Sequence, residues 1–312
     1  MRICVRFTAR AGIMNLLLKY VRLFSLFSFI LLKAASSVAA PYPGVKEQVS
    51  KVAAPHVFAV IPFYSPEKIW IYYSPFVDYL RKSTGQSWEL KLFNTHDEVL
   101  EGICDGRITV ALLGPVPLGR ASDRCGVKPL LVALGKDGKP FYRSMILTNE
   151  PSVTTLKGLK GKKVGFFKGS TAAHIMPAKM LKDAGLDMGS IQPIFLESQD
   201  RMISALFSGE IAAAGVKETL ARKFSNDKLQ AIATSPQLPN FAVCATPSLP
   251  GKIREGLVTT LSRLKPLTNG RDAEITKGWD DEIKNGFVLP DRQYLPSVLK
   301  IHAIFREVQH EN

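Results

Sequence analysis

The stretch KVGFFKGSTAAHIMPAKMLKDAG, residues 163–185, decides the fold class of this 312-residue chain. Its first five residues form an apolar run with the length of a buried strand, and residues 172–185 have the composition of a helix that ends at Gly185. Similar pairs of strand and helix recur on both sides of it. HVFAVIPF (56–63) reads as a strand and SPFVDYLRKSTG (74–85) as a helix that ends at Gly85, and a further helix opens at THDEVLEGICDG (95–106) with Thr95 and Glu98 at the spacing of a capping box. Strands that alternate with helices indicate parallel strands joined by helical crossovers, so we expect an α/β fold.

The loop between this strand and this helix offers hydrogen-bond donors. Proline is tolerated only in the first turn of a helix, so Pro177 places the helix start near Ala173 or His174. Ser170 and Thr171 then meet the free N–H groups and the positive end of the helix dipole. This arrangement favours an anion. On these residues alone, the alternative that the two hydroxyls only cap the helix stays open.

The loop does not have the pattern of a catalytic centre. Around Ser170 and Thr171 there is neither a GxSxG elbow nor an SxxK motif, and the chain has no GxxxxGK[ST] loop for nucleotide phosphates. His174 could serve as a base, but a histidine in a first turn is more often a surface residue. No CxxC occurs, and the five histidines lie at no metal-ligand spacing. We therefore expect no enzyme, no metal and no cofactor.

Residues 1–39 are expected to be a secretory signal peptide, which predicts a periplasmic protein. Met1 to Lys33 contains six basic residues and no acidic one, and LFSLFSFILL (23–32) precedes a run of small residues. Ten apolar residues span about 15 Å as a helix, half of the hydrocarbon layer of about 30 Å, so an uncleaved anchor is the weaker alternative. Translation from Met14 instead of Met1 would leave a compact signal of the same kind.

The mature chain is moderately basic. Removal of the signal lowers the formal charge from +14 to +8, because six of the 41 basic residues lie in it. The remaining Lys and Arg residues are scattered and are not interleaved with aromatic residues, so we do not expect a nucleic-acid partner.

Three cysteines remain after cleavage, and exported cysteines usually pair. Cys104 and Cys125 each lie near the end of a predicted helix beside the strand at residues 109–114. We therefore expect a Cys104–Cys125 disulfide and a free, buried Cys244.

The order of the elements predicts two lobes. The α/β pattern pauses in a polar segment after residue 148, restarts for about ninety residues, and ends in helices. We expect one lobe from residues 55–148 and 240–312, and a second from residues 149–239. Two segments that cross between the lobes would frame a cleft, where ligands of such folds usually bind.

Six sequence blocks, in order and at similar spacing, resemble those of the phosphate, phosphite and phosphonate substrate-binding proteins of bacterial ABC importers. They are VIPFYSPEKIWIYYSPFVDYLRKSTG (60–85), LLGPVPLGRA (112–121), LKGKKVGFFKGSTAAHIMPAKMLKDAG (159–185), ISALFSGE (203–210), TSPQLPN (234–240) and NGFVLPDRQYLPSVLKI (285–301). The resemblance implies a type II periplasmic-binding-protein fold with two lobes that close on a small oxyanion. It also implies an exported protein that delivers this ligand to an ABC permease in the inner membrane.

The resemblance also implies a ligand set. The Ser-Thr-Ser-Gly anion loop of the family falls on residues 170–173, where the two hydroxyls are kept and the last two positions are alanines. A second candidate group is acidic, because an aminoalkyl phosphonate needs a carboxylate for its ammonium, and Glu197 and Glu218 could supply it. The expected ligand-binding residues are Ser170, Thr171, Ala172 and Ala173 of the second lobe, Tyr64, Ser65 and Gly114 of the first, and Gln199 and Glu218.

Four positions depart from the family pattern. Leu118 stands where a tyrosine is usual and Gln199 where a histidine is usual, and Thr109 and Ala212 replace aspartates. These departures leave a second functional hypothesis open, in which the chain is a ligand-sensing or degenerate binding domain that feeds a signalling partner such as a sensor kinase.

We predict that the signal is cleaved after Ala39. Ser37 and Ala39 place small residues at the two positions that a signal peptidase reads, whereas cleavage after Ala40 would leave Pro41 next to the cut. The intact mass of the exported protein measures this directly. A mature species that still contains residues 23–32 would contradict the prediction and favour a membrane anchor.

Overall fold

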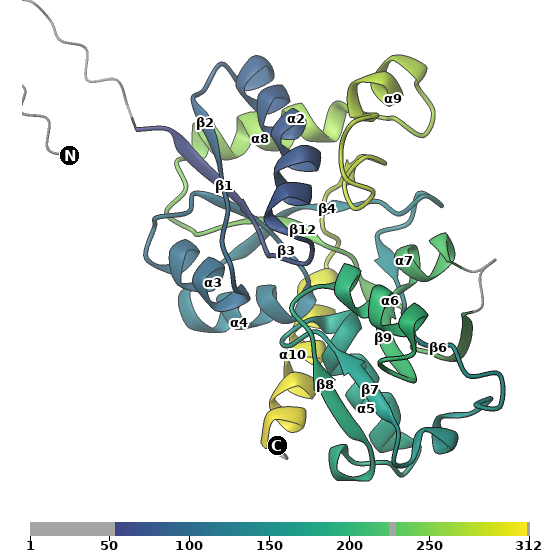
Figure 1. The fold of residues 1–312 in the computed structure, drawn as a ribbon. Helices are drawn as coiled ribbons and strands as arrows, with labels where there is room; N and C mark the ends of the chain where they lie inside the picture. The colour runs from purple at the N-terminus through teal and green to yellow at the C-terminus, as the bar shows by residue number, and fades with distance from the viewer. Residues whose placement is uncertain (1–53, 225–228, 311–312) are drawn as a thin grey trace, which may run out of the picture. The chain divides into compact units, whose positions relative to one another are not determined.

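The computed structural model describes residues 54–224 and 229–310. The predicted signal peptide lies outside these residues. Within them the chain forms a six-stranded sheet, a five-stranded sheet and a two-stranded ribbon (Figure 1). We call the part around the six-stranded sheet lobe 1 and the part around the five-stranded sheet lobe 2. None of the described helices is long and apolar enough to cross a membrane.

Lobe 1 is built on a mixed sheet in the order β13-β4-β12-β3-β1-β2. Strand β1 pairs in parallel with β2 and β3, and β12 returns from later in the chain to lie antiparallel between β3 and β4. The strands are β1 (His56–Val60), β2 (Trp88–Lys91), β3 (Val110–Leu113), β4 (Lys128–Ala133), β12 (Ala242–Ala245) and β13 (Phe287–Val288). The helices are α2 (Pro66–Thr84), α3 (His96–Cys104), α4 (Pro115–Cys125), α8 (Gly251–Arg263), α9 (Gly270–Thr276) and α10 (Tyr294–His310).

Lobe 2 repeats this plan with the order β10-β6-β9-β7-β8. Strand β7 pairs in parallel with β8 and β9, and β6 lies antiparallel to β9 and β10. The strands are β6 (Ser144–Thr148), β7 (Lys163–Phe166), β8 (Gln192–Phe195), β9 (Ala213–Lys217) and β10 (Gln230–Thr234). The helical segments are η1 (Leu156–Leu159), η2 (Thr171–Ile175), α5 (Met176–Asp183), η3 (Met188–Ser190), α6 (Gln199–Ser208) and α7 (Glu218–Lys223).

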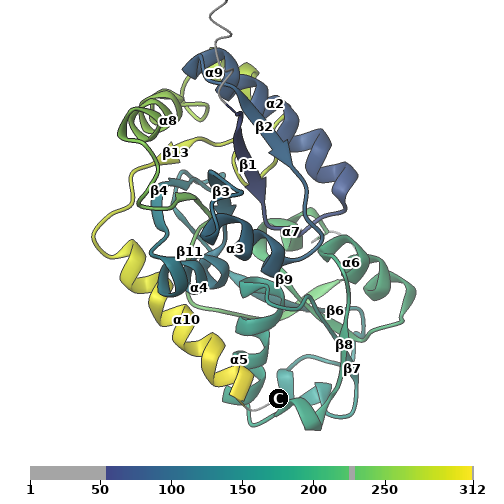
Figure 2. The same cartoon turned by 90° about the vertical axis from the view of Figure 1, so that its left-hand side faces the viewer.

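The chain crosses between the two sheets at the two-stranded ribbon of β5 (Phe141–Tyr142) and β11 (Leu238–Pro239), whose strands are antiparallel. The predicted lobe boundary after residue 148 is therefore one strand late, because β6 belongs to the second sheet. The polar segment that suggested the boundary follows β6, and sequence alternation does not tell which sheet a strand joins. Helix α10 also differs from the expectation, since it contacts α4 in lobe 1 and η2 and α5 in lobe 2 (Figures 1 and 2).

Helix α2 begins eight residues before the predicted start at Ser74. Ser65 caps it by accepting the N–H of Lys68 at 3.5 Å, and Pro66 occupies the first helical position. The helix predicted at residues 74–85 is thus only the second part of α2, and Pro75 lies inside the helix. The predicted end is confirmed, since Gly85 has a φ of 65° and is the C-cap. Such a left-handed conformation favours glycine.

The helix after the predicted anion loop begins at Thr171, two residues earlier than expected. Its first turn, η2, is a wide π-helical turn that continues into α5. Pro177 has no N–H for the carbonyl of Ala173, and that carbonyl instead accepts the N–H of Phe167 at 2.9 Å. The wide turn therefore accommodates proline beyond the first turn. On the neighbouring strand, a Cβ at Gly215 would lie 2.2 Å from Pro177, so this close approach requires glycine.

The predicted disulfide is confirmed. Cys104 ends α3 and Cys125 ends α4, the two helices pack against each other, and the Cα atoms of the two cysteines are 5.5 Å apart. Cys244 is a free cysteine buried in β12, also as expected.

The disulfide closes a loop with a sequence separation of 21 residues. In the chain-entropy model such a loop contributes about 3 kcal/mol. We predict that C104S/C125S lowers the free energy of unfolding in urea by roughly this amount and that reductant, which lowers the stability of the unmodified protein, has no further effect on the variant. Equal stability of the two proteins under oxidising conditions would contradict this.

Candidate functional site

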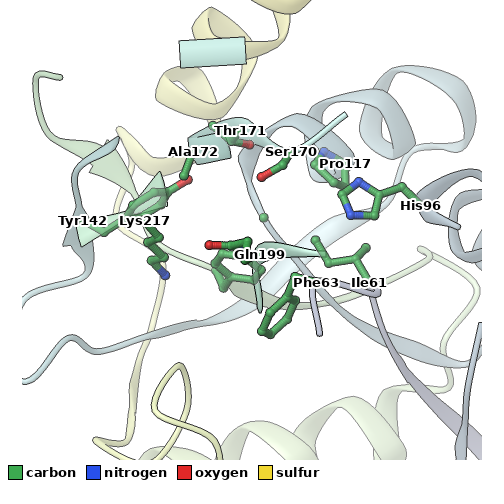
Figure 3. A pocket seen from close by; sticks show the side chains of 12 residues that line it. Ile61, Phe63, His96, Pro117, Tyr142, Ser170, Thr171, Ala172, Gln199 and Lys217 are labelled. Carbon is green, nitrogen blue, oxygen red and sulfur yellow. The ribbon is translucent and has the colours of Figure 1, made fainter. Parts of the chain in front are cut away.

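A pocket lies where the two lobes meet, at the ends of strands from both sheets (Figure 3). Its volume is about 10 Å³, enough for about one water molecule. Lobe 1 contributes mainly apolar groups and lobe 2 mainly polar groups. The lining residues are Ile61, Phe63, His96, Gly114 and Pro117 of lobe 1, Ser170, Thr171, Ala172, Gln199 and Lys217 of lobe 2, and Tyr142 and Phe241 near the crossing.

The hydroxyls of Ser170 and Thr171 each accept one structural hydrogen bond. Ser170 Oγ accepts the N–H of Ala173 at 3.2 Å, which is a helix cap, and Thr171 Oγ1 accepts the N–H of Val116 at 3.0 Å. A hydroxyl that accepts a hydrogen bond still has its own proton to donate. The two readings of this loop are therefore compatible, since each hydroxyl stabilises the fold and can also donate to an anion in the pocket.

Several helices begin at this pocket. Gly114 is the N-cap of α4, Ser170 is the N-cap of η2, and His96 and Gln199 are the first residues of α3 and α6. The first N–H groups of a helix have no acceptor within the helix, and its N-terminus carries a partial positive charge. The pocket thus offers an anion favourable electrostatics without a full positive charge from the backbone.

A buried ion pair lies beside the pocket, and its lysine lines the pocket from lobe 2. Lys217, the last residue of β9, pairs with Glu282 of lobe 1 and donates to Asn240 Oδ1 at 2.8 Å. Its Nζ lies 4.2 Å from the centroid of the Tyr142 ring and 4.4 Å from that of Phe241. Burial lowers the pKa of the Lys217 ammonium, and the Glu282 carboxylate opposes this shift. The pair brings almost no net charge to the pocket, because the Lys217 ammonium balances the Glu282 carboxylate.

The lobes are closed on each other around the pocket. The N–H of Gln199 on α6 donates to the carbonyl of Phe63 at 3.4 Å, and Lys68 of α2 pairs with Asp200 of α6 at 2.9 Å. These contacts link the start of α6 in lobe 2 to the loop after β1 and to the start of α2 in lobe 1.

The structure brings five of the predicted site residues to the pocket, which are Ser170, Thr171, Ala172, Gly114 and Gln199. Four others do not line it. Ala173 has its N–H bonded to Ser170, Ser65 caps α2, the Tyr64 ring packs 4.6 Å from that of Phe63, and Glu218 pairs with Arg222 at 2.6 Å. Glu197, the other acidic candidate, is exposed.

Three of the four departures from the family pattern lie away from the pocket lining. Leu118 is fully buried in α4. Thr109 precedes β3, where its Oγ1 accepts the N–H of Val57 at 3.1 Å, and Ala212 precedes β9, where its carbonyl accepts from Thr148 Oγ1 at 2.7 Å. Only Gln199 lines the pocket.

Sequence reasoning missed three polar residues that line the pocket, namely Lys217, His96 and Tyr142. Lys217 had a signal, because it ends a buried strand just before a helix. His96 had one as well, since it follows the Thr95 cap at a helix start. Tyr142 had none, because its position depends on where the chain crosses between the lobes.

The sequence profile of a family described as "ABC transporter, phosphonate, periplasmic substrate-binding protein" matches residues 58–294. The chain belongs to this family. Phosphate-import protein PhnD of Mycolicibacterium smegmatis is 29% identical over 183 residues, which make up 54% of this chain and 57% of that relative. The match spans little more than half the length of that relative. The family description names transport, so the signalling hypothesis has no support from it.

Solved structures show the same fold. A binding protein component of an ABC phosphonate transporter from Pseudomonas aeruginosa has a TM-score of 0.71 and 16% identity, over 83% of this chain and 89% of that chain. PhnD1 from Prochlorococcus marinus, in complex with methylphosphonate, has a TM-score of 0.68 and 15% identity, over 81% of this chain and 98% of that chain. The predicted type II periplasmic-binding-protein fold with two lobes is confirmed.

We predict that E282Q lowers the free energy of unfolding by about 3 to 5 kcal/mol, because it leaves the Lys217 ammonium buried without a countercharge. The double variant K217M/E282L, which replaces the pair by apolar groups, should lose less. Urea denaturation of the unliganded proteins measures both.

The matched control for this prediction is D281N. Asp281 is adjacent in sequence and pairs with Lys223 of lobe 2, but both side chains are partly exposed. Its loss should cost no more than about 1 kcal/mol. An E282Q protein as stable as D281N would show that the buried pair does not contribute as argued.

Proposed function

We propose that this protein is an exported solute-binding protein that captures a small oxyanion for an ABC importer. The observation that carries the proposal is the pocket between the lobes, where the hydroxyls of Ser170 and Thr171 meet the starts of α4, η2 and α6 (Figure 3). Hydroxyl donors and helix N-termini stabilise negative charge, and burial strengthens both effects because water does not compete.

The pocket favours a small ligand such as phosphate, phosphite or a short alkyl phosphonate. In its closed form the pocket has room for about one water molecule, so even a small oxyanion requires the lobes to move apart, and one side of the pocket is formed by apolar groups such as Ile61, Phe63 and Phe241. The described residues that line it include no aspartate or glutamate, and the nearby Glu282 is paired with Lys217. An aminoalkyl phosphonate would therefore bury its ammonium without a carboxylate partner, which is costly.

The family and two named proteins support this ligand class. The Mycolicibacterium smegmatis relative is a phosphate-import protein, and the Prochlorococcus marinus protein was solved with methylphosphonate. For this chain we propose the same chemistry, a periplasmic location after cleavage of residues 1–39, and an inner-membrane permease as the partner that receives the ligand.

We predict that S170A/T171A weakens binding of the oxyanion by at least tenfold. The change removes two hydrogen bonds to a charged ligand, each worth about 1.5 to 3 kcal/mol. It also removes the cap at Ala173 and the bond to Val116, so the unliganded protein should lose about 1 kcal/mol or more of stability. Calorimetric titration with phosphate, phosphite and methylphosphonate, beside thermal melting, separates the two effects.

The control for this variant is N269A. Asn269 caps α9 by accepting the N–H of Arg271 at 3.0 Å, and it does not line the pocket. N269A should lower the melting temperature and leave the dissociation constant unchanged. If S170A/T171A behaves in the same way, the two hydroxyls are helix caps only and the proposed site is wrong.

A further inference from the structure

Two ion pairs join the lobes outside the pocket. Lys68 of α2 in lobe 1 pairs with Asp200 of α6 in lobe 2 at 2.9 Å. Lys223, the last residue of α7 in lobe 2, pairs with Asp281 of lobe 1. All four side chains are partly exposed, and none of them lines the pocket. Each pair therefore crosses the boundary between the lobes without contacting the space for the ligand.

The two pairs lie beside the same loop, which joins β1 to α2. The Nζ of Lys68 lies 5.7 Å from the centroid of the Tyr64 ring in this loop. Burial, and then nearby carboxylates that include Asp200 and Asp281, raise the pKa of the Tyr64 phenol. Both pairs are therefore within electrostatic reach of Tyr64, and they act on the same part of the boundary between the lobes.

Helix α10 lies on the other side of the molecule and packs against both lobes. It contacts α4 in lobe 1 and η2 and α5 in lobe 2. Its residues Ile301 and Phe305 share one apolar cluster with Val116 of α4 and Ile175 of η2. In Figure 2, α10 lies on one side, and α2 and α6 lie on the opposite side. A motion that opens the lobes while α10 keeps its contacts therefore separates α2 from α6.

Such an opening breaks the ion pairs between the lobes. The pocket in its closed form has room for about one water molecule, so release of an oxyanion requires the lobes to move apart. A single exposed ion pair contributes little, but both pairs oppose the same motion. A ligand that binds only the closed form is held more tightly when the closed form is more stable.

From this geometry we propose that these two ion pairs form a latch, which holds the lobes closed over the captured oxyanion. The inference rests on the proposed function, because it assigns part of the affinity for the oxyanion to residues outside the pocket. Lys68, Asp200, Lys223 and Asp281 are then positioning residues. They act on the ligand only through the closed arrangement of the lobes.

The test reverses the charge on the lobe 1 side of both pairs. K68E places a carboxylate opposite Asp200, D281K places an ammonium opposite Lys223, and the net charge of the protein stays the same. Titration of the unmodified protein with inorganic phosphate, phosphite, methylphosphonate and sulfate first selects the anion that binds most tightly, and this anion is the probe. At low ionic strength K68E/D281K should weaken its binding by about fivefold or more.

The matched control is K68E/D200K/K223E/D281K, which restores both pairs with the charges exchanged. Its net charge is again unchanged, and like K68E/D281K it lacks the pair of Asp281 with Lys284 inside lobe 1. It should bind the anion within about twofold of the unmodified protein. The milder variant K68Q/D281N removes both pairs without creating repulsion, and its affinity should lie between those of K68E/D281K and the unmodified protein.

The outcomes separate the latch from the proposed function. An unchanged dissociation constant in K68E/D281K overturns the latch, even if the melting temperature falls, because the pairs would then stabilise the fold only. Equal weakening in the control with exchanged charges also overturns it. In both cases the proposed function stands if S170A/T171A still weakens binding. If the unmodified protein binds none of the four anions at millimolar concentration, the proposed function fails and this inference fails with it.

Discussion

The hydrogen bond from the N–H of Val116 to Thr171 Oγ1 is the contact on which the site depends. It joins the first turn of α4 in lobe 1 to the first turn of η2 in lobe 2, so two helix N-termini face the same small space. Two like partial charges at close range repel unless negative charge lies between them. An anion at the proposed site would therefore favour closure of the lobes, and closure would strengthen the proposed preference for an anion.

The buried charges of the protein itself are arranged so that they leave this preference intact. Lys217 and Glu282 neutralise each other across the two lobes, and the rings of Tyr142 and Phe241 cover the ammonium. An unpaired carboxylate here would oppose an oxyanion, and an unpaired ammonium would be costly to bury. In the proposed site, recognition is thus left to neutral donors, chiefly hydroxyls and backbone N–H groups.

Sequence reasoning predicted the elements that local rules determine. The strand at residues 163–166, the capping box of Thr95 and Glu98, the Gly85 helix end and the Cys104–Cys125 pairing follow from residue type and spacing. Sequence reasoning failed where contacts between residues far apart in the sequence determine the structure. The start of η2 depends on a carbonyl that accepts from Phe167, and the assignment of β6 depends on pairing with β9 and β10.

The same limit applies to the site. The anion loop is visible in the sequence, but Tyr142 is placed by the crossing ribbon, and His96 by helix α3, which packs against α4 and β3. The family pattern expects a tyrosine at Leu118 and a histidine at Gln199, and the pocket instead contains a phenol and an imidazole from these two other positions.

The most direct measurement is a crystal structure of the mature protein grown with the anion that binds most tightly in titration. The account predicts tetrahedral density between the lobes, within hydrogen-bonding distance of Ser170 Oγ and Thr171 Oγ1 and next to the start of α4. An anion bound on another surface, with the pocket between the lobes filled only by water, would contradict it.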